Sequence, residues 1–290
     1  MPRQIQNTRN RIDPILCYRK MNATCGVKIS TMRRSFIRGI IQSIQPYVVF
    51  MALLTLIPVT SSLASTWKTL SPGMEYQDLI KNPLTPWAHI HVFRIDLQHY
   101  QLDLVTAKDL SKRQASINEL ARKSHAMLAI NGGFFDSAYR PLGLRIYQQQ
   151  EHNPVKHISW WGIFLIKNQI PSIISSREYE TNHQVQFAIQ SGPRLIINGS
   201  IPHLRPGVAE RSALGLTRRN KLIVLVTDNA LITTTELAQL MKSTPLNCEN
   251  ALNLDGGSSS QLYARIASFR LNVHGFSNVS DAIVITPKKH

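Results

Sequence analysis

Apolar and polar residues alternate in short runs through much of the chain after residue 88. The alternation over 88–97 and 100–107, with Gln98 and His99 between them, predicts a hairpin. The segment 211–228 predicts two strands that turn at Arg219 and Asn220. Further strands are expected at 125–131, 158–167, 185–190 and 281–286, where apolar runs are bounded by polar residues.

Two segments carry the signature of a helix start. Ser116 is followed three residues later by Glu119, and Thr233 is followed in the same way by Glu236, which is the spacing of a capping box. Strands still dominate, without regular alternation of strand and helix. We therefore expect an α+β fold, a single domain over 88–288 with a mixed, largely antiparallel sheet and a few packed helices. Residues 65–87, which include three prolines, are expected to be a lead-in.

The first 64 residues have the character of a signal or targeting segment. The apolar stretch 48–58 is short for a membrane span, basic residues precede it, and Ser62-Leu63-Ala64 offers small residues for cleavage. Met32 is an alternative start, and Arg33-Arg34 resembles a twin-arginine signal. We expect export to the periplasm or the cell exterior with cleavage near Ala64, the alternative being an uncleaved membrane anchor. Cleavage would leave Cys248 as the one cysteine, so no internal disulfide is expected.

The net charge of +16 does not predict a nucleic-acid partner, because of how it is distributed. Residues 1–64 hold nine basic residues and one acid, and the remainder holds 24 basic and 16 acidic residues, a net charge of +8 for each part. No stripe of Lys and Arg interleaved with aromatic residues occurs after residue 64. Nucleic-acid binding is therefore set aside, and a membrane contact is expected only through an uncleaved signal segment.

Four strand ends share one style, in which an apolar run leads into glycine, serine or a charged side chain. They are "NGGFFD" (131–136), "QSGPR" (190–194), "ERSA" (210–213) and "ALNLDGGSSSQLY" (251–263). Glycines allow a ligand to approach the backbone, arginine binds phosphate in bidentate fashion, and carboxylates serve as acid, base or nucleophile. Each segment also has a simpler interpretation as a turn, a helix cap or an ion pair.

In this order and spacing, the four motifs resemble the phosphodiester glycosidase family. The resemblance covers residues 88–288 and implies an α+β domain that hydrolyses the glycosidic bond of a sugar-1-phosphodiester. Many bacterial members of that family are exported proteins with a loose link to exopolysaccharide. Two segments depart from the family pattern. Asp228-Asn229-Ala230 and Thr233-Thr234 replace expected glycines, and His274 stands where many relatives carry arginine.

The resemblance leads to a set of candidate roles. Asp255, Asp136 and Asp228 are the candidate catalytic carboxylates, with Glu210 as a further candidate, and their division into acid, base and nucleophile stays open. No cofactor is expected, the alternative being Ca²⁺ or Mg²⁺ held by Asp255, Asn131 and Asp136. The partner is a sugar-1-phosphodiester or a phosphorylated glycan. The expected substrate-binding residues are Asn131, Gly132, Gly133, Arg194, Arg211, Ser212, Gly256, Gly257, Ser258 and Ser259.

Three other functions are alternatives to hydrolysis of a phosphodiester. A non-catalytic glycan-binding or sugar-phosphate-binding protein on the same fold is the main alternative. A serine hydrolase using Ser258 or Ser259 with His274 and Asp255 lacks the Gly-x-Ser-x-Gly turn. A zinc enzyme finds no support, since His89 and His91 are most simply one face of a strand.

Overall fold

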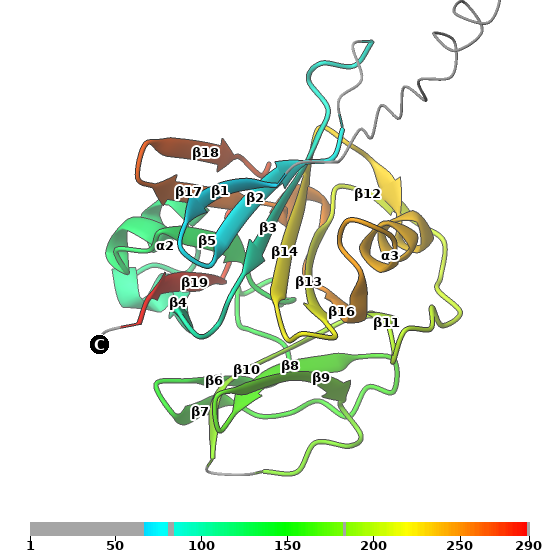
Figure 1. Cartoon of the computed structure of the whole chain (residues 1–290). Coiled ribbons are helices and arrows are strands. Elements are labelled where there is room, and N and C mark those ends of the chain that lie inside the picture. The colour runs from blue at the N-terminus through cyan, green and yellow to red at the C-terminus, as the bar shows by residue number, and fades with distance from the viewer. Residues whose placement is uncertain (1–66, 81–83, 182–183, 289–290) are drawn as a thin grey trace, which may run out of the picture. The chain divides into compact units, whose positions relative to one another are not determined.

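The computed structural model describes residues 67–80, 84–181 and 184–288 (Figure 1). Of these residues, 47% lie in strands and 11% in helices, and every sheet is antiparallel. The expected α+β domain with one mixed sheet and a few packed helices is therefore wrong, because the described chain forms a β-rich fold with several sheets and two α-helices. Many of the extra strands are three to five residues long, too short to show a clear alternation of apolar and polar positions.

Three large sheets and one small one make up this part of the chain. The seven-stranded sheet has the order β1 (Lys68–Ser71), β2 (Met74–Asp78), β3 (His89–Ile95), β14 (Leu222–Asp228), β13 (Ser212–Thr217), β16 (Cys248–Asn253), β11 (Arg194–Ile196). The β5 sheet has the order β18 (Phe269–Val273), β17 (Leu262–Ile266), β5 (Leu128–Asn131), β19 (Asp281–Pro287), β4 (Tyr100–Thr106). The β10 sheet has the order β7 (Gln150–Asn153), β6 (Arg145–Tyr147), β10 (Val185–Ser191), β8 (Gly162–Lys167), β9 (Ile170–Ser175). The small sheet pairs β12 (Val208–Ala209) with β15 (Ile232–Thr233).

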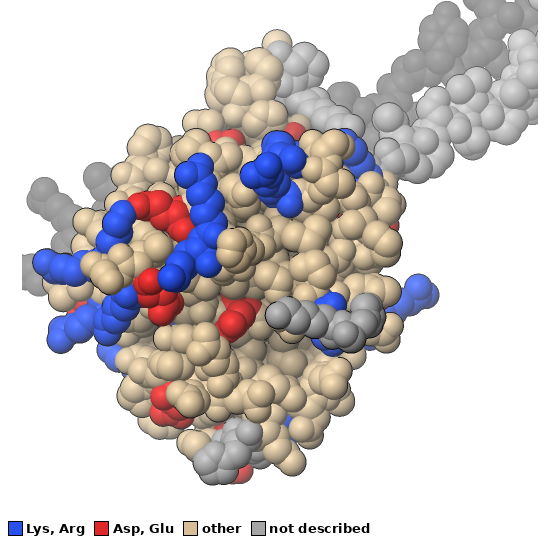
Figure 2. Space-filling model, turned by 90° about the vertical axis from the view of Figure 1, so that its left-hand side faces the viewer, with Lys and Arg blue, Asp and Glu red and all other residues tan. Residues whose placement is uncertain are grey.

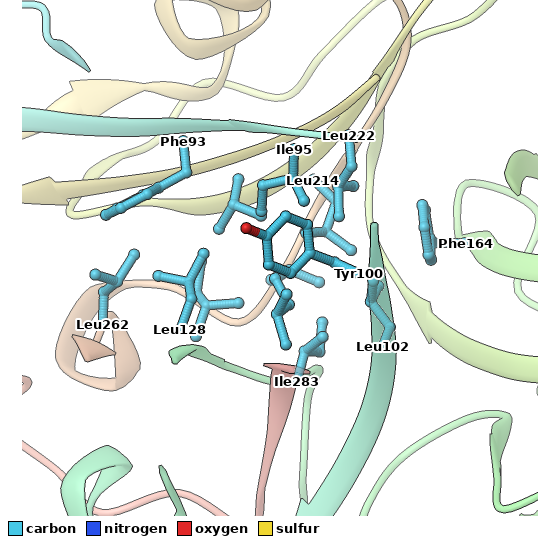
Figure 3. Close-up of a cluster of buried hydrophobic side chains, with 14 of the residues drawn as sticks. Phe93, Ile95, Tyr100, Leu102, Leu128, Phe164, Leu214, Leu222, Leu262 and Ile283 are labelled. Atoms are coloured by element: carbon cyan, nitrogen blue, oxygen red, sulfur yellow. The ribbon is translucent and has the colours of Figure 1, made fainter. Parts of the chain in front are cut away.

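The three large sheets share one hydrophobic core. Phe93 and Ile95 of β3, Leu128 of β5 and Phe164 of β8 meet there with side chains from most of the other strands (Figure 3). Because these side chains are removed from water, burying each contributes on the order of 2 kcal/mol to stability. The shared core fixes where the ends of the strands in different sheets come together.

Two of the large sheets are each covered by one α-helix. Helix α3 (Thr234–Lys242) packs on β16 and β11, and helix α2 (Ile117–Lys123) packs on β5 and β19. Both helices begin at the predicted capping boxes, in which Ser116 and Thr233 accept from the backbone of Glu119 and Glu236. Two short 3₁₀ segments, η1 (Ala107–Leu110) and η2 (Gly257–Ser259), complete the described helices.

The strands around residue 97 pair differently from the expectation. β3 and β4 do not form the predicted hairpin: β3 pairs with β2 and β14, while β4 pairs with β19 in another sheet. Residues 68–78, expected as a lead-in, supply β1 and β2 to the seven-stranded sheet. The hairpin of β13 and β14 is confirmed, with Asn220 in the left-handed conformation at its turn.

The surface charge of the described residues is mixed on the face that bears α2, β17 and β18. Figure 2 shows lysine and arginine side chains gathered among acidic ones on one side of this face, with further charged groups scattered over mostly uncharged surface elsewhere in the view. In the part of the chain that the structure describes, no helix is both long enough and apolar enough to span a membrane. The segment 1–64, expected to be a signal, lies outside the described residues.

Candidate active site

Most of the candidate residues lie along one edge of the seven-stranded sheet, the edge formed by the ends of its strands and not by an outermost strand. Because neighbouring strands are antiparallel, the end of β14 at Asp228, the start of β13 at Ser212, the end of β16 at Asn253 and the start of β11 at Arg194 all lie at this edge. We call it the site edge. The ends of strands from the β5 and β10 sheets meet it.

Asn131, the last residue of β5, joins the site edge to the β5 sheet. Its side-chain Oδ1 accepts from Ser212 Oγ at 2.6 Å and from the Gln261 backbone N–H at 3.2 Å. Its Nδ2 donates to the Asp255 backbone carbonyl at 2.7 Å. Since Asn131 is fully buried, each of these hydrogen bonds replaces one to water. The Asn131 side chain thus joins its own motif to two of the other three.

Gly132 and Gly133 lie between the β5 and β10 sheets. A Cβ added to Gly132 would stand 1.8 Å from Asp281 Oδ1, and one added to Gly133 would stand 2.8 Å from both an Arg145 side-chain nitrogen and the Gln190 carbonyl. Both glycines are therefore required by close packing within the protein. This observation favours a structural reason for the pair over direct contact with a ligand.

Arg145 and Asp281 form a buried ion pair beneath these glycines that sequence reasoning missed. Arg145 Nε donates to Asp281 Oδ2 at 3.0 Å, and the two side chains are 1% and 0% exposed. Because Arg145 lies on β6 and Asp281 on β19, the pair links the β10 and β5 sheets. Arg145 Nη1 also donates to the Gln190 carbonyl at 3.1 Å. The available signal was a single charge inside each of two apolar runs, "LGLRIY" and "SDAIVI".

Asp255 follows β16 and presents a half-buried carboxyl group at the site edge. Burial raises the pKa of Asp255, hydrogen bonds from Ser259 and from the Gly256 backbone lower it, and the charge of Asp281 raises it further, with a net upward shift. The Gly256 bond to Oδ1 is 3.1 Å long. A carboxyl with a raised pKa retains its proton to a higher pH, which suits general acid–base chemistry.

The glycine and serine run after Asp255 packs against the start of β13. Gly257 donates its backbone N–H to the Glu210 carbonyl at 2.8 Å, and a Cβ on Gly256 would stand 2.9 Å from the same oxygen. Gly257 has a φ of +62°, which favours glycine. Ser259 is buried and bonded to Asp255, whereas Ser258 is exposed. Ser259 therefore belongs to the carboxyl's hydrogen-bond shell, and Ser258 is accessible from solvent.

Asp228 and Glu210 form a second acidic group at the site edge. Glu210 is largely buried and accepts the Asn229 backbone N–H at 3.0 Å, while Asp228 Oδ1 accepts from the Asn229 side chain at 2.9 Å. Burial raises the pKa of Glu210, the Asn229 bond lowers it, and the charge of Asp228 raises it, with a net upward shift. Two nearby carboxyls in different surroundings are a common arrangement for dividing acid and base roles.

The two candidate arginines are held in different ways. Arg211 donates from Nε to the Ile232 carbonyl at 3.2 Å and from Nη2 to the Gly207 carbonyl. Arg211 is therefore bonded to backbone carbonyls in and beside the small sheet. The simpler interpretation of this arginine, an ion pair with a carboxylate, is not what the described residues show. Arg194 packs its stem on Gly162 and is half-buried, and its guanidinium has no hydrogen-bond or ion-pair partner within the described residues. Arg194 thus retains its donors for a ligand.

Asp136 is bonded within its own loop. Its Oδ1 accepts from the backbones of Ala138 and Arg140, and its Oδ2 accepts from Arg140 Nε at 2.7 Å. The Arg140 backbone bond is the largest of the influences that lower the pKa of this half-buried carboxyl. These contacts are those of a turn-stabilising aspartate, and none of them involves the groups around Asp255.

No group of three or more His, Cys, Asp or Glu side chains among the described residues has an arrangement that could hold a metal ion. Of the residues considered for Ca²⁺ or Mg²⁺, Asn131 uses its oxygen for Ser212 and Gln261, and Asp136 is bonded within its loop.

A cavity of about 660 Å³ lies at the opposite edge of the seven-stranded sheet. Three of the five basic side chains that line it are ion-paired: Arg218 with Glu249, Arg94 with Glu75, and Lys221 with Asp96. Cys248 borders it, and burial raises the pKa of this thiol to about 12, so it is not a thiolate nucleophile. The chemistry of the described residues therefore points to the site edge and not to this cavity.

Comparison with known proteins agrees with the ordered motifs. The profile of the phosphodiester glycosidase family matches residues 124–286, more than half of the chain. The chain belongs to the phosphodiester glycosidase family. The matched span includes Asn131, Asp255 and the Arg145–Asp281 pair, and it leaves β1 to β4 outside.

Individual relatives of this phosphodiester glycosidase family member are distant. The uncharacterized protein YigE of Escherichia coli K12 is 28% identical over 220 residues, which cover 72% of this chain and 82% of YigE. The catalytic domain of zebrafish N-acetylglucosamine-1-phosphodiester α-N-acetylglucosaminidase, auto-inhibited by its pro-peptide, has a TM-score of 0.56 at 18% identity, over 75% of this chain and 85% of that one. A hypothetical protein from Synechocystis has a TM-score of 0.54 at 16% identity, over 77% of this chain and 64% of that one. At these identities, the two structures establish a shared fold.

Proposed function

We propose that this protein hydrolyses the glycosidic bond of a sugar-1-phosphodiester at the site edge. The observation that carries the proposal is the half-buried Asp255 carboxyl, whose pKa is raised and which is held by Gly256 and Ser259 beside the Asn131 network. Family membership supplies the reaction class. The substrate is accordingly a phosphorylated glycan or another sugar phosphodiester.

Asp255 is proposed as the proton donor. As the bond between the anomeric carbon and the phosphate oxygen breaks, the bond's electron pair goes to that oxygen, which takes the Asp255 proton and departs in a phosphate monoester. The Asp228–Glu210 pair accepts a proton from water, whose oxygen bonds to the anomeric carbon. A phosphate leaving group is already stable as an anion, so modest assistance from the acid suffices.

Arg194 is proposed to face the phosphate. Its guanidinium has no partner among the described residues, while Arg211 is engaged with two backbone carbonyls. A fixed positive group contributes most where negative charge grows during the reaction. Arg194 should therefore matter more to kcat than to substrate binding.

Activity of the purified protein on a sugar-1-phosphodiester tests the proposal. Phosphorus NMR should show conversion of the diester into the monoester of the aglycone, with release of free sugar and not of sugar-1-phosphate. Asp255→Asn should lower kcat about 100-fold or more, since general acid–base groups contribute at least this much. Arg194→Ala should lower kcat by about the same factor.

Asp96→Asn is the matched control, because Asp96 is an ion-paired carboxylate at the opposite edge of the sheet. It should leave kcat unchanged. A protein that binds the sugar phosphodiester without turnover would support the glycan-binding alternative and reject the enzymatic one. Release of sugar-1-phosphate would show that a different bond is cleaved.

The proposed location is outside the cytoplasm, with a mature chain that begins near Ser65. The support is the short apolar stretch 48–58 followed by Ser62-Leu63-Ala64. An exported enzyme would meet exopolysaccharide and other extracytoplasmic glycans. N-terminal sequencing of the protein recovered from the periplasm or medium should begin within a few residues of Ser65. A full-length chain retained in the membrane would contradict this location.

A further inference from the structure

Two histidines of β3 lie beside the site edge and point into the space between sheets. His89 and His91 occupy the same face of the strand, and their rings stack with centroids 5.2 Å apart at 15°. His91 is only 4% exposed, and strand pairing places His89 opposite Asp228. Both histidines lie outside the region matched by the family profile.

His91 is bonded through one ring nitrogen. Its Nδ1 lies 2.9 Å from the Tyr76 hydroxyl oxygen. Its Nε2 is buried, has no hydrogen-bond partner among the described residues, and lies 3.8 Å from Asp228 Oδ2. A separation of 3.8 Å is an ion-pair distance and not a hydrogen bond, and catalytic contacts of this kind often shorten when substrate binds.

The surroundings select one tautomer of the neutral ring. If Nδ1 carried the proton, the Nε2 lone pair would face the Asp228 carboxylate and repel it. With the proton on Nε2, Tyr76 O–H donates to Nδ1 and Nε2–H points to the carboxylate. Burial raises the pKa of Tyr76, and the charge of Asp78 raises it further, so the hydroxyl keeps the proton that it donates.

We propose that Tyr76, His91 and Asp228 form a positioning chain behind the site edge, in which His91 Nε2–H holds the Asp228 carboxylate toward the substrate. The inference rests on the proposed function, because it assigns a supporting group to the carboxyl pair that accepts the proton from water. Tyr76 fixes the tautomer, His91 supplies the donor, and Asp228 presents its other oxygen to Asn229. His91 is thus a positioning residue that does not touch the substrate.

Charged and titratable groups face His91 from three strands. They are Tyr76 and Asp78 of β2, His89 of its own strand, and Asp228 of β14. Burial is the largest influence and lowers the pKa of His91, the charge of Asp78 raises it and that of His89 lowers it, with a net downward shift. His91 is therefore neutral at neutral pH, and the chain described above is the form present there.

Nitrogen NMR of the labelled imidazoles tests the chain without any substrate. The wild-type protein at neutral pH should show His91 as the Nε2–H tautomer. Tyr76→Phe should produce a mixture of tautomers, and Asp228→Asn should lower the pKa of His91 by removing the neighbouring carboxylate. An Nδ1–H tautomer in the wild type, or a His91 titration that Asp228→Asn does not move, would overturn the proposal.

Kinetics of folded variants test the effect of this positioning chain on kcat. His91→Leu should lower kcat about 10- to 100-fold, the worth of a hydrogen bond to a charged group. His91→Gln should retain most of kcat, because the glutamine Nε2 reproduces the donor. His89→Gln is the matched control: its ring is bonded to Asp78 at 2.7 Å, and it should stay near wild-type kcat.

The outcomes separate this inference from the proposed function. If the wild type hydrolyses sugar-1-phosphodiesters while folded His91→Leu matches it in kcat at every pH, the positioning role is wrong and the function stands. If the NMR results agree and the wild type shows no hydrolysis, the function is wrong and the Tyr76–His91–Asp228 contact stands. Loss of folding in His91→Leu leaves His91→Gln and the NMR measurements to decide.

Discussion

Among the described glycines, Gly132 is the one whose added Cβ would come closest to another atom. Its Cβ would stand 1.8 Å from Asp281 Oδ1, in the buried ion pair that links the β5 and β10 sheets. Gly132→Ala should therefore lower the free energy of unfolding by about 1–3 kcal/mol, as overpacking does. Denaturant unfolding measures the loss.

Gly207→Ala is the matched control for this substitution. The nearest atom to its added Cβ is an Arg211 nitrogen at 4.0 Å, an ordinary contact distance, so stability should change little. Equal losses in the two variants would show that the effect does not come from the Asp281 contact, since alanine at an unstrained glycine position otherwise reduces the entropy of the unfolded chain and favours folding.

Single residues were predictable where chemistry limits the choice. Asn131, Ser212 and Asp255 were found from motifs, and the structure bonds Asn131 both to the Ser212 hydroxyl and to the Asp255 backbone. Arg145 and His91 were missed because a lone charge or imidazole in an apolar run acquires a role only from a partner far along the chain. Asp281 is 136 residues from Arg145, and no local pattern connects them.

At the scale of elements, local pattern predicted strands better than it predicted their partners. The β13–β14 hairpin was predictable because Asn220 readily adopts the left-handed conformation that its turn requires. The β3–β4 hairpin was wrong because two alternating strands with a short connection can also turn from one sheet into the next. The pairing of β3 with β14 and of β4 with β19 depends on packing across the shared core, which periodicity does not record.

The capping boxes, unlike the strand pairings, depend only on residues close together in the sequence. Both predicted boxes form, since Ser116 with Glu119 and Thr233 with Glu236 satisfy backbone groups within three residues of each other.

Asp136 shows that the same local chemistry can mislead about function. Its carboxylate satisfies the turn that follows it, a role that was open from the sequence alongside catalysis.

At the scale of the whole described domain, three sheets around one core bring strand ends from distant parts of the sequence to the site edge. The order of motifs identified the family, but the number and arrangement of sheets did not follow from it. Short strands such as β6 and β11 are defined by their partners, and β11 adds only three residues to the seven-stranded sheet. The family was therefore more predictable from the sequence than the architecture of its sheets.

This architecture holds two carboxyls, Asp255 and Glu210, where burial raises their pKa values, and this should affect the stability of the domain. An unfolded aspartate or glutamate titrates near pH 3.9–4.3. Between that range and the higher folded pKa, the folded protein binds more protons than the unfolded chain. These two groups therefore make stability fall as pH rises through this window, and their cost persists at neutral pH.

Asp255→Asn removes the cost of ionising one of these groups. Relative to the wild type, it should gain unfolding free energy between pH 3 and pH 7, while losing activity. Asp96→Asn should behave oppositely. Although burial acts to raise the pKa of Asp96, the hydrogen bonds from Lys221 and Gln98 lower it overall, so its stabilising effect is present above the unfolded pKa and lost as pH falls. Denaturant unfolding of the three proteins at both pH values measures the two differences. If Asp255→Asn instead lost unfolding free energy relative to the wild type on going from pH 3 to pH 7, the fold would stabilise the charged Asp255 carboxylate of the wild type, and Asp255 could not then serve as the proton donor.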